Sequence, residues 1–511
     1  MLSDWTSGYV ADIGYTYGYY NELNPLRVKL AFLHQGLVYP HVGKACELGF
    51  GQGLSANIHA AASTTTWYGT DFNPSQASFA QDLAAHSGAG AELFDQAFAE
   101  FTRRQNLPEF DFIGLHGIWS WISDENRAVI VDFIGRKLKV GGVLYISYNT
   151  LPGWAAFAPM RHLMTEHAEV LGAEGRGIVS RIDGAIDFAE KLLATNPIFS
   201  RSNPQVSERL RKMKEHSRHY LAHEYFNRDW HPMHVSTMAG WLEPAKVHFA
   251  CSAHYLEHVD GLNLTAEQQV FLKEIPDPMF RETVRDFMVN QQFRRDYWVK
   301  GARKLNALEQ AEQLRQQRVV LTSHRPDVSL KVSGALGEGQ MSEAVYAPIL
   351  DELADHKVKT LAEIEQALRD KVTFVQLVQA VLVLTGAGHM ALAQDEPVIA
   401  KARKQAERLN GHLCQKARGS AEISYLASPV TGGGLSVNRI QQLFLQAVGQ
   451  GSKHPSQWAQ HVWQILSSQG QKLLKDGKAL ETADENLAEL VSQAETFAAK
   501  HLPIMKALQI V

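Results

Sequence analysis

The stretch that decides the fold is ACELGFGQGLSANIHAAASTTTWYGTDFNP, residues 45–74. Two short apolar runs, 45–48 and 66–69, flank a glycine loop and an alanine-rich segment of helical composition at 55–62. A strand, a glycine loop, a helix and a second strand in this order are typical of a parallel sheet that binds a ligand at the carboxyl ends of its strands. We therefore predict an α/β domain built around this stretch.

The same alternation continues beyond residue 74. Further strands are predicted at 91–94, 110–115 and 143–148, with helices at 75–86 and 126–138, which indicates a parallel, doubly wound, Rossmann-like sheet. Residues 155–171, 178–194 and 207–223 then have helical patterns, before strand-like segments return at 246–251 and 293–299. We therefore expect a core over 1–154, a helical insertion or lid over 155–230, and the remainder of the core with an exit helix, at 302–318, over 231–322.

The C-terminal part, 323–511, is predicted to be a mostly helical, winged-helix-like domain. A Pro/Ser/Gly-bearing linker at 323–339 precedes three short apolar helices, 343–354, 361–369 and 374–384, and a strand-like segment at 389–393. Residues 331–400 carry 5 Lys/Arg against 10 Asp/Glu, and a domain with this negative net charge binds the phosphates of nucleic acid poorly. We expect it to contact protein rather than nucleic acid.

Composition excludes several classes of protein. The formal net charge of the 511 residues is −4, which offers no general attraction for nucleic acid or an anionic membrane. Three widely spaced cysteines favour a reducing compartment. The first ten residues have no apolar signal-peptide core, and the most apolar window, 374–393, is interrupted by polar residues and glycines. We expect a cytoplasmic protein with no stable membrane insertion.

The loop Glu47-Leu-Gly49-Phe-Gly51-Gln-Gly53 differs in spacing from the dinucleotide fingerprint. Glycines at these positions let the backbone turn tightly and approach a ligand, although a purely structural turn has the same composition. The leading acid, Glu47, suits a ligand that carries an amino group and a sulfonium.

A second carboxylate, Asp71, stands 18 residues after Gly53, at the end of the next predicted strand. A carboxylate there can bind both ribose hydroxyls of an adenosine ligand. Asn73 is counted with the same binding loop, but either Asp71 or Asn73 would also serve as the N-cap of the following helix.

Together these residues resemble the class I S-adenosylmethionine methyltransferases. The resemblance implies that Gly49, Gly51 and Gly53 hold the methionine part of the cofactor and Asp71 its ribose. It also implies that Asp95 and Gln96, after the third predicted strand, contact the adenine. No metal is required by this chemistry.

A narrower resemblance rests on Leu115-His-Gly-Ile-Trp-Ser-Trp-Ile122, on Tyr145-Ile-Ser-Tyr-Asn-Thr-Leu-Pro-Gly-Trp154, and on His223-Glu-Tyr-Phe-Asn227 with His231-Pro-Met233. These segments are similar to bacterial methyltransferases with a methyltransferase regulatory region, among them the rickettsial protein-lysine methyltransferases. The resemblance covers about residues 24–303 and implies a protein substrate.

The methyl acceptor is expected at the ends of the fourth and fifth strands. Tyr148 and Asn149 are predicted to orient the acceptor nitrogen, and Trp154 to hold a cationic or methylated amine by cation–π contact. His116 either relays a proton or packs beside the adenine or carboxylate of the cofactor. Trp119 and Trp121 are either residues of this pocket or residues of the core. Tyr17 and Tyr20 either fold over the cofactor or form an aromatic latch at the surface.

Two clusters have a structural interpretation beside a functional one. The histidines 216, 219, 223, 231 and 234 are expected to be structural, because no H-E-x-x-H pattern occurs. The basic run from Arg209 to Arg218 is expected to be a solvated helix face, with docking of an acidic substrate as the alternative. The function predicted is N-methylation of protein lysine side chains; the rivals are a small-molecule or glycan methyltransferase and a non-catalytic cofactor-binding protein. A homodimer is compatible with the large insertion.

Overall fold

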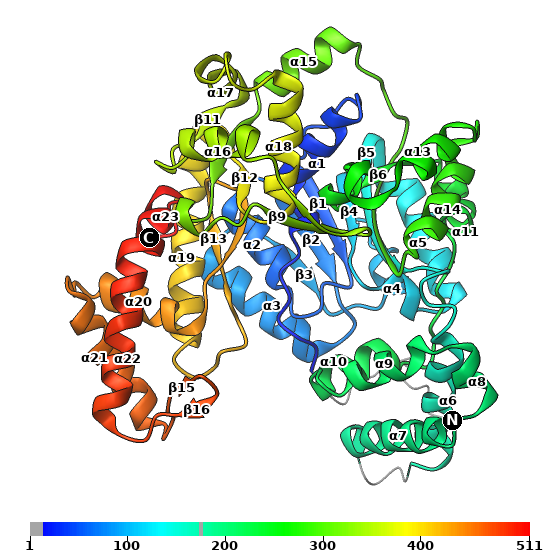
Figure 1. Ribbon diagram of the computed structural model, residues 1–511, viewed down its shortest axis with the longest axis horizontal. Coiled ribbons are helices and arrows are strands. Elements are labelled where there is room, and N and C mark those ends of the chain that lie inside the picture. The colour runs from blue at the N-terminus through cyan, green and yellow to red at the C-terminus, as the bar shows by residue number, and fades with distance from the viewer. Residues whose placement is uncertain (1–13, 173–176) are drawn as a thin grey trace.

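The computed structural model describes residues 14–172 and 177–511, and its centre is a seven-stranded sheet (Figure 1). The strands are β1 (Lys44–Leu48), β2 (Thr66–Thr70), β3 (Glu92–Phe94), β4 (Phe110–Leu115), β5 (Leu138–Asn149), β6 (His248–Ser252) and β7 (Phe293–Val299), in the order β3-β2-β1-β4-β5-β7-β6. The predicted Rossmann-like sheet and all seven strands are confirmed. The expectation of a wholly parallel sheet is wrong at β7, which lies between β5 and β6 and runs antiparallel to both.

Alternate residues of the central strands enter two different cores, one on each face of the sheet. In β5, Val143 and Tyr145 belong to one core, whereas Leu144 and Ile146 belong to the other. This is the period of two expected of a strand, and burial of both faces explains why these strands are apolar throughout. The helices around the sheet are α1 (Pro25–His34), α2 (Leu54–Ala62), α3 (Pro74–Ser87), α4 (Phe98–Phe101) and α5 (Asp124–Lys137), and after the insertion α11 (Val235–Leu242), α12 (Asp260–Asn263), α13 (Ala266–Lys273) and α14 (Pro278–Val289).

The insertion after β5 forms a helical lobe with its own apolar core. Its helices are α6 (Ala158–Val170), α7 (Gly177–Ala194), α8 (Ile198–Ser202), α9 (Gln205–Met213) and α10 (Arg218–Tyr225), and they lie together at one end of the molecule (Figure 1). The single helix predicted at 207–223 is two helices. The Ser217 hydroxyl accepts a hydrogen bond from the Tyr220 amide and so starts α10 as a new helix.

Helix α15 (Ala307–Arg315) is shorter than the helix predicted at 302–318, because strand β8 (Arg318–Leu321) begins directly after it. The predicted linker at 323–339 contains a hairpin, β9 (Lys331–Gly334) with β10 (Gly337–Gln340), that packs against Leu262 of the core region. Then come α16 (Glu343–Glu352), β11 (Lys359–Thr360), α17 (Leu361–Ala367), α18 (Phe374–Gly386) and β12 (Met390–Leu392). This is the expected order of helices and strands; the winged-helix assignment and the domain boundaries stay predictions.

Helix α19 (Glu396–Lys416) joins the C-terminal helices to the sheet domain, since it packs against both α2 and α3 (Figure 1). The remaining elements are β13 (Tyr425–Ser428), β14 (Gly433–Ser436), α20 (Arg439–Gly449), α21 (Pro455–Ser468), β15 (Leu474–Lys475), β16 (Lys478–Ala479), α22 (Ala483–Thr496) and α23 (Leu502–Ala507). In the two described ranges, no helix combines the length and the apolar character that crossing a bilayer demands. The segment 1–10, predicted not to be a signal peptide, lies outside these ranges.

Candidate functional site

A cavity opens at the carboxyl ends of β1 to β4, and we call it the sheet-edge cavity. Each strand contributes residues that closely follow it: Gly49 and Gly51 after β1, Asp71 after β2, Gln96 after β3 and His116 after β4. The other lining residues are Tyr15, Tyr20, Phe50, Phe72, Gln76, Ala97, Phe98, Gly117, Ile118, Trp121, Ile122, Ser123, Asn126 and Asp229. The lining residues therefore follow one another along the cavity in the same order as their strands in the sheet, β3-β2-β1-β4.

The three glycines of the first loop have different tasks. All have left-handed backbone angles, with φ of 73° at Gly49, 58° at Gly51 and 67° at Gly53. A Cβ on Gly49 would lie 2.5 Å from the Ile118 side chain, at the wall of the cavity, so glycine keeps this wall open. Gly53 does not line the cavity; its Cβ would lie 2.4 Å from that of Ala80, and glycine here lets α2 pack closely on α3.

Asp71 is fixed in the cavity wall by two backbone amides. Its carboxylate accepts hydrogen bonds from the amides of Gly51, at 2.9 Å, and of Asn73, at 3.0 Å. Burial raises its pKa to about 6, while these two hydrogen bonds lower it. The N-cap of α3 is Asn73, whose side chain accepts from Ser75 and Gln76 and which does not line the cavity. Asp71 is thus free of the capping task that it was also predicted to have.

Glu47, in β1, is a buried carboxyl that does not line the sheet-edge cavity, and no cation lies beside it within residues 14–172 and 177–511. Only 1% of the residue is exposed, and Oε2 has no hydrogen-bond partner. Burial raises the pKa of Glu47 to about 8, and the neighbouring Asp71 charge contributes to this rise. A buried polar atom without a partner is costly, so this carboxyl is suited to a ligand that supplies a positive charge.

His116 lies between two aromatic rings at the end of the cavity next to β4. It stacks on Tyr20, with ring centroids 3.5 Å apart, and its Nδ1 is 2.8 Å from the Tyr145 hydroxyl. Burial lowers the pKa of His116 to about 4, so the imidazole is neutral at pH 7. Tyr20 lines the cavity, whereas Tyr17 packs against Phe79 and does not line it. That Tyr20 folds over the cofactor stays a prediction.

Of the two tryptophans after β4, one is a core residue and the other lines the cavity. Trp119 is fully buried and donates from Nε1 to the Met233 sulfur at 3.3 Å. Trp121 lines the cavity, and its buried Nε1 has no hydrogen-bond partner. It therefore offers an indole N–H and a ring face to a ligand.

The structure places three of the predicted catalytic residues away from this cavity. The Tyr148 hydroxyl donates to Asp296 Oδ2 at 2.8 Å, in a buried network in which Asp296 also pairs with Arg294. Asn149 is buried at the end of β5, where its backbone N–H donates to the Ser120 hydroxyl. Trp154 packs in the core of the insertion. Of the predicted catalytic residues, His116 alone lines the cavity.

At the far end of the cavity, Gln96 contributes to the wall, whereas Asp95 does not line it. Sequence reasoning missed the aromatic residues Tyr15 and Phe98, and also Asp229, which lies 75 residues of chain after Trp154. Asp229 has no local motif, so only the fold brings it to the cavity.

The histidines expected to be structural each have a separate environment. His223 packs edge-on against Tyr15, and His234 stacks on Phe287. His231 lies 3.6 Å from Asp229, and His219 lies 3.2 Å from the Gly14 carbonyl. A different group, Asp82, His86 and His412, brings three potential ligand atoms within 4.8 Å between α3 and α19, but the Lys416 ammonium already lies 3.0 Å from Asp82. That cation makes a salt-bridge cluster the better description.

Comparison with known proteins gives this geometry a family. Residues 217–300 match the model described as the predicted methyltransferase regulatory domain. A Rickettsia typhi structure, PKMT2 in complex with AdoHcy, covers 96% of this chain and 99% of its own with a TM-score of 0.69 at 15% identity, which establishes the fold. A Rickettsia prowazekii protein, RP789, is 25% identical over 191 residues, 36% of this chain and 33% of its own.

The Synechocystis protein sll1526, described as uncharacterized, is 42% identical over 512 residues, 99% of either chain. An identity of this level over the full length is shared by homologues with the same fold. The chain has the class I methyltransferase fold with a methyltransferase regulatory domain, and it belongs to the same family as Synechocystis sll1526.

Proposed function

We propose that this protein is an S-adenosylmethionine-dependent methyltransferase that methylates the side-chain nitrogen of lysine in proteins. The observation that carries the proposal is a pair of neighbouring buried carboxyls. Asp71 lines the sheet-edge cavity and is held by backbone amides. Glu47 lies close enough for the Asp71 charge to act on it and has no cation beside it among the described residues, although it does not itself line the cavity. S-adenosylmethionine carries a ribose diol, which suits the first, and two positive charges, which suit the second.

The order of residues along the sheet supports one direction of binding. Gln96 and Phe98 follow β3 and would contact adenine, Asp71 follows β2 and would bind the ribose, and the loop after β1 would hold the methionine part. The AdoHcy bound to PKMT2 is the demethylated form of this cofactor, in a protein of the same fold. When bound, the cofactor supplies an electrophilic methyl group, and the residues after β4 are then the nearest to it.

Those residues suit a lysine acceptor. The pKa of a lysine side chain in water is ~10.4, so forming its neutral amine at pH 7 costs on the order of 4–5 kcal/mol, and burial in a poorly hydrated pocket reduces this cost. Tyr20, Trp121 and the neutral His116 form such a pocket. If His116 donates from Nδ1 to the Tyr145 hydroxyl, Nε2 is left as a hydrogen-bond acceptor that can hold the acceptor amine in line.

Glu224 adds a partly ionised carboxyl on this side. It lies close enough to Tyr20 to raise the pKa of the Tyr20 hydroxyl, and burial raises the pKa of Glu224 itself to about 7. An ammonium entering beside Tyr20 therefore meets a carboxyl able to ionise as it arrives. A neutral sugar hydroxyl or an aromatic acceptor would leave this charge without a partner.

Incubation with methyl-labelled cofactor and a lysate tests the proposal. We expect label in protein bands and methyl-lysine after hydrolysis. Label confined to small metabolites would show the small-molecule or glycan rival instead, and tight cofactor binding without transfer to any acceptor would show a non-catalytic binding protein.

A further inference from the structure

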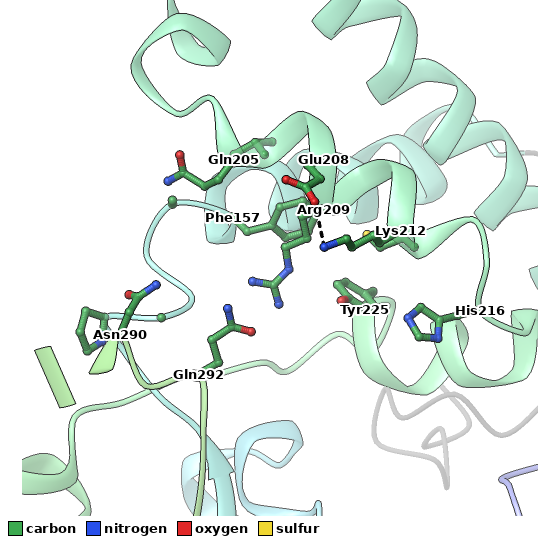
Figure 2. Close-up of a pocket in the computed structure, with 14 residues that line it drawn as sticks. Phe157, Gln205, Glu208, Arg209, Lys212, His216, Tyr225, Asn290 and Gln292 are labelled. Carbon is green, nitrogen blue, oxygen red and sulfur yellow. Dashed lines mark ion pairs between the residues drawn. The ribbon is translucent and has the colours of Figure 1, made fainter. Parts of the chain in front are cut away.

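A second cavity, about 450 Å³ in volume, lies where the helical insertion meets the sheet, and we call it the insertion cavity. Its walls come from the loop after β5, from α9 and α10, and from the turn that leads into β7 (Figure 2). We propose that it binds a carboxylate side chain of the protein substrate, close to the lysine that is methylated. This inference rests on the proposed function, because it supplies that function with a specificity determinant.

The cation of the insertion cavity is Arg209, whose guanidinium points into the open space above Gln292 and beside Tyr225 (Figure 2). It lies over the Trp154 ring, 3.8 Å from the ring centroid, and 4.8 Å from that of Phe157, and it hydrogen-bonds Tyr225. Cation–π contact with two rings, whose planes are inclined at 63° to each other, holds the guanidinium in place and leaves part of its edge for a ligand.

Arg209 has no acidic partner within the described ranges, which separates it from three paired cations of the basic run. Lys212 pairs with Glu208 at 2.8 Å, Lys214 with Glu190 at 2.9 Å and Arg218 with Asp183 at 2.6 Å. Over residues 14–172 and 177–511, no carboxylate lies within ion-pair distance of Arg209. Arg211 has no ion pair among the described residues either, but it is exposed and does not line the insertion cavity. The unpaired guanidinium in this cavity is therefore that of Arg209.

A single positive charge with a flat, two-pronged edge matches one carboxylate. Arginine binds a carboxylate through two parallel hydrogen bonds, whereas a phosphate dianion would leave one of its charges uncompensated beside Glu208. Side-chain amides of Gln292, Asn290 and Gln205 also line the insertion cavity and can donate to the same oxygens (Figure 2).

The insertion cavity lies further along the sheet than the sheet-edge cavity, in the direction from β4 to β7. The latter ends at His116 after β4, and the next neighbours in the sheet are β5 and then β7. Pro152 follows β5, and Gln292 directly precedes Phe293, the first residue of β7, which runs in the opposite direction. The Phe293 ring centroid is 6.3 Å from that of His116.

Neighbouring strands are about 4.8 Å apart, so two strand positions separate the two cavities by roughly 10 Å. A peptide can cover this distance within a few residues, since an extended chain advances about 3.3 Å per residue. Glu224 lies near Tyr20 on the lysine side, and Tyr225, the next residue, faces Arg209. The molecule thus offers a carboxyl to a lysine and a guanidinium to an acid in one substrate.

The test uses fluorescent peptides with a central lysine, in which a glutamate is scanned through the positions on either side, and partners with glutamine in its place. Binding in the presence of AdoHcy and methyl transfer are both measured. We expect one glutamate position to lower KM about tenfold against its glutamine partner, with kcat unchanged. Arg209→Gln should remove this preference, and Arg209→Lys should restore part of it.

Arg211→Gln is the matched control, because Arg211 is an exposed residue of the same helix that does not line the insertion cavity. It should keep the preference. Thermal unfolding of the Arg209 variants shows whether the lobe stays folded, and Gln292→Ala tests the insertion cavity without touching the stack on Trp154.

The outcomes separate this inference from the proposed function. Equal methylation of glutamate and glutamine peptides, or a preference that survives Arg209→Gln, overturns the insertion-cavity inference while lysine methylation stands. Glutamate-dependent, Arg209-dependent binding without methyl transfer supports the insertion cavity and contradicts the function. Competition by inorganic phosphate but not by acetate, with no difference between the peptides, would show a phosphate site and overturn the carboxylate.

Discussion

The unpartnered carboxyl of Glu47 predicts that cofactor binding depends on pH. With a pKa of about 8 in the free protein, Glu47 is protonated in most molecules at pH 7. A ligand with positive charges stabilises the ionised form, so binding releases a proton. Because the bound state holds fewer protons than the free state, affinity must rise with pH until the pKa of the free carboxyl is passed.

The size of the effect follows from that pKa. Ionising a group of pKa about 8 costs about 1.4 kcal/mol at pH 7 and about 2.7 kcal/mol at pH 6, so the affinity for S-adenosylmethionine should rise about tenfold over this unit of pH. Calorimetry in buffers of different ionisation enthalpy measures both the affinity and the proton released.

Two controls assign the effect to Glu47. Methylthioadenosine has the adenine and the ribose but neither positive charge, so any titration of Asp71 affects both ligands and only the difference belongs to Glu47. Glu47→Gln should bind S-adenosylmethionine with the shallow pH dependence of methylthioadenosine. If the variant keeps the steep slope, or if both ligands show it in the native protein, the assignment of Glu47 is refuted.

Three further substitutions have definite outcomes. Asp71→Ala should weaken cofactor binding by roughly 10- to 100-fold, as expected for loss of charge-assisted hydrogen bonds, and an unchanged Kd would remove Asp71 from the ribose site. Tyr148→Phe should lower the free energy of unfolding by about 1 kcal/mol, since it removes one buried hydrogen bond to Asp296, and leave kcat intact; a large fall in kcat with normal stability would return Tyr148 to the mechanism. Gly53→Ala should destabilise the protein by about 2 kcal/mol or more in denaturant unfolding, because its Cβ would meet that of Ala80 at 2.4 Å with φ at 67°, and native stability would contradict the packing role of this glycine.

The cofactor end of the site could be predicted because it is local in sequence. Gly49, Gly51 and Asp71 each closely follow a strand, and parallel strands bring their carboxyl ends together. The acceptor end could not be predicted in the same way. Residues 143–149 are all buried, so the sequence has no amphipathic signal to say which face each side chain occupies.

That ambiguity explains the difference between two tyrosines of β5. Tyr145 and Tyr148 are three positions apart in the strand and therefore face opposite sides of the sheet, and it is Tyr145 that contacts His116. Tyr20 and Asp229 reach the cavity from segments far away in the chain, which no local pattern records. In the insertion, the basic residues have similar spacing and charge, and only the ion pairs and the lining of the cavity separate Arg209 from its neighbours.

The most direct test of the central claim is a transfer experiment with S-adenosylmethionine that carries a trideuterated methyl group. Purified protein, lysate proteins from the same cells and the labelled cofactor are incubated, and the tryptic peptides are sequenced by tandem mass spectrometry. We predict deuterated methyl groups on lysine side chains with the native protein, and far fewer with Asp71→Ala at a cofactor concentration near the Kd of the native protein. Deuterium found only on small molecules, on other side chains, or equally with the variant would contradict the claim.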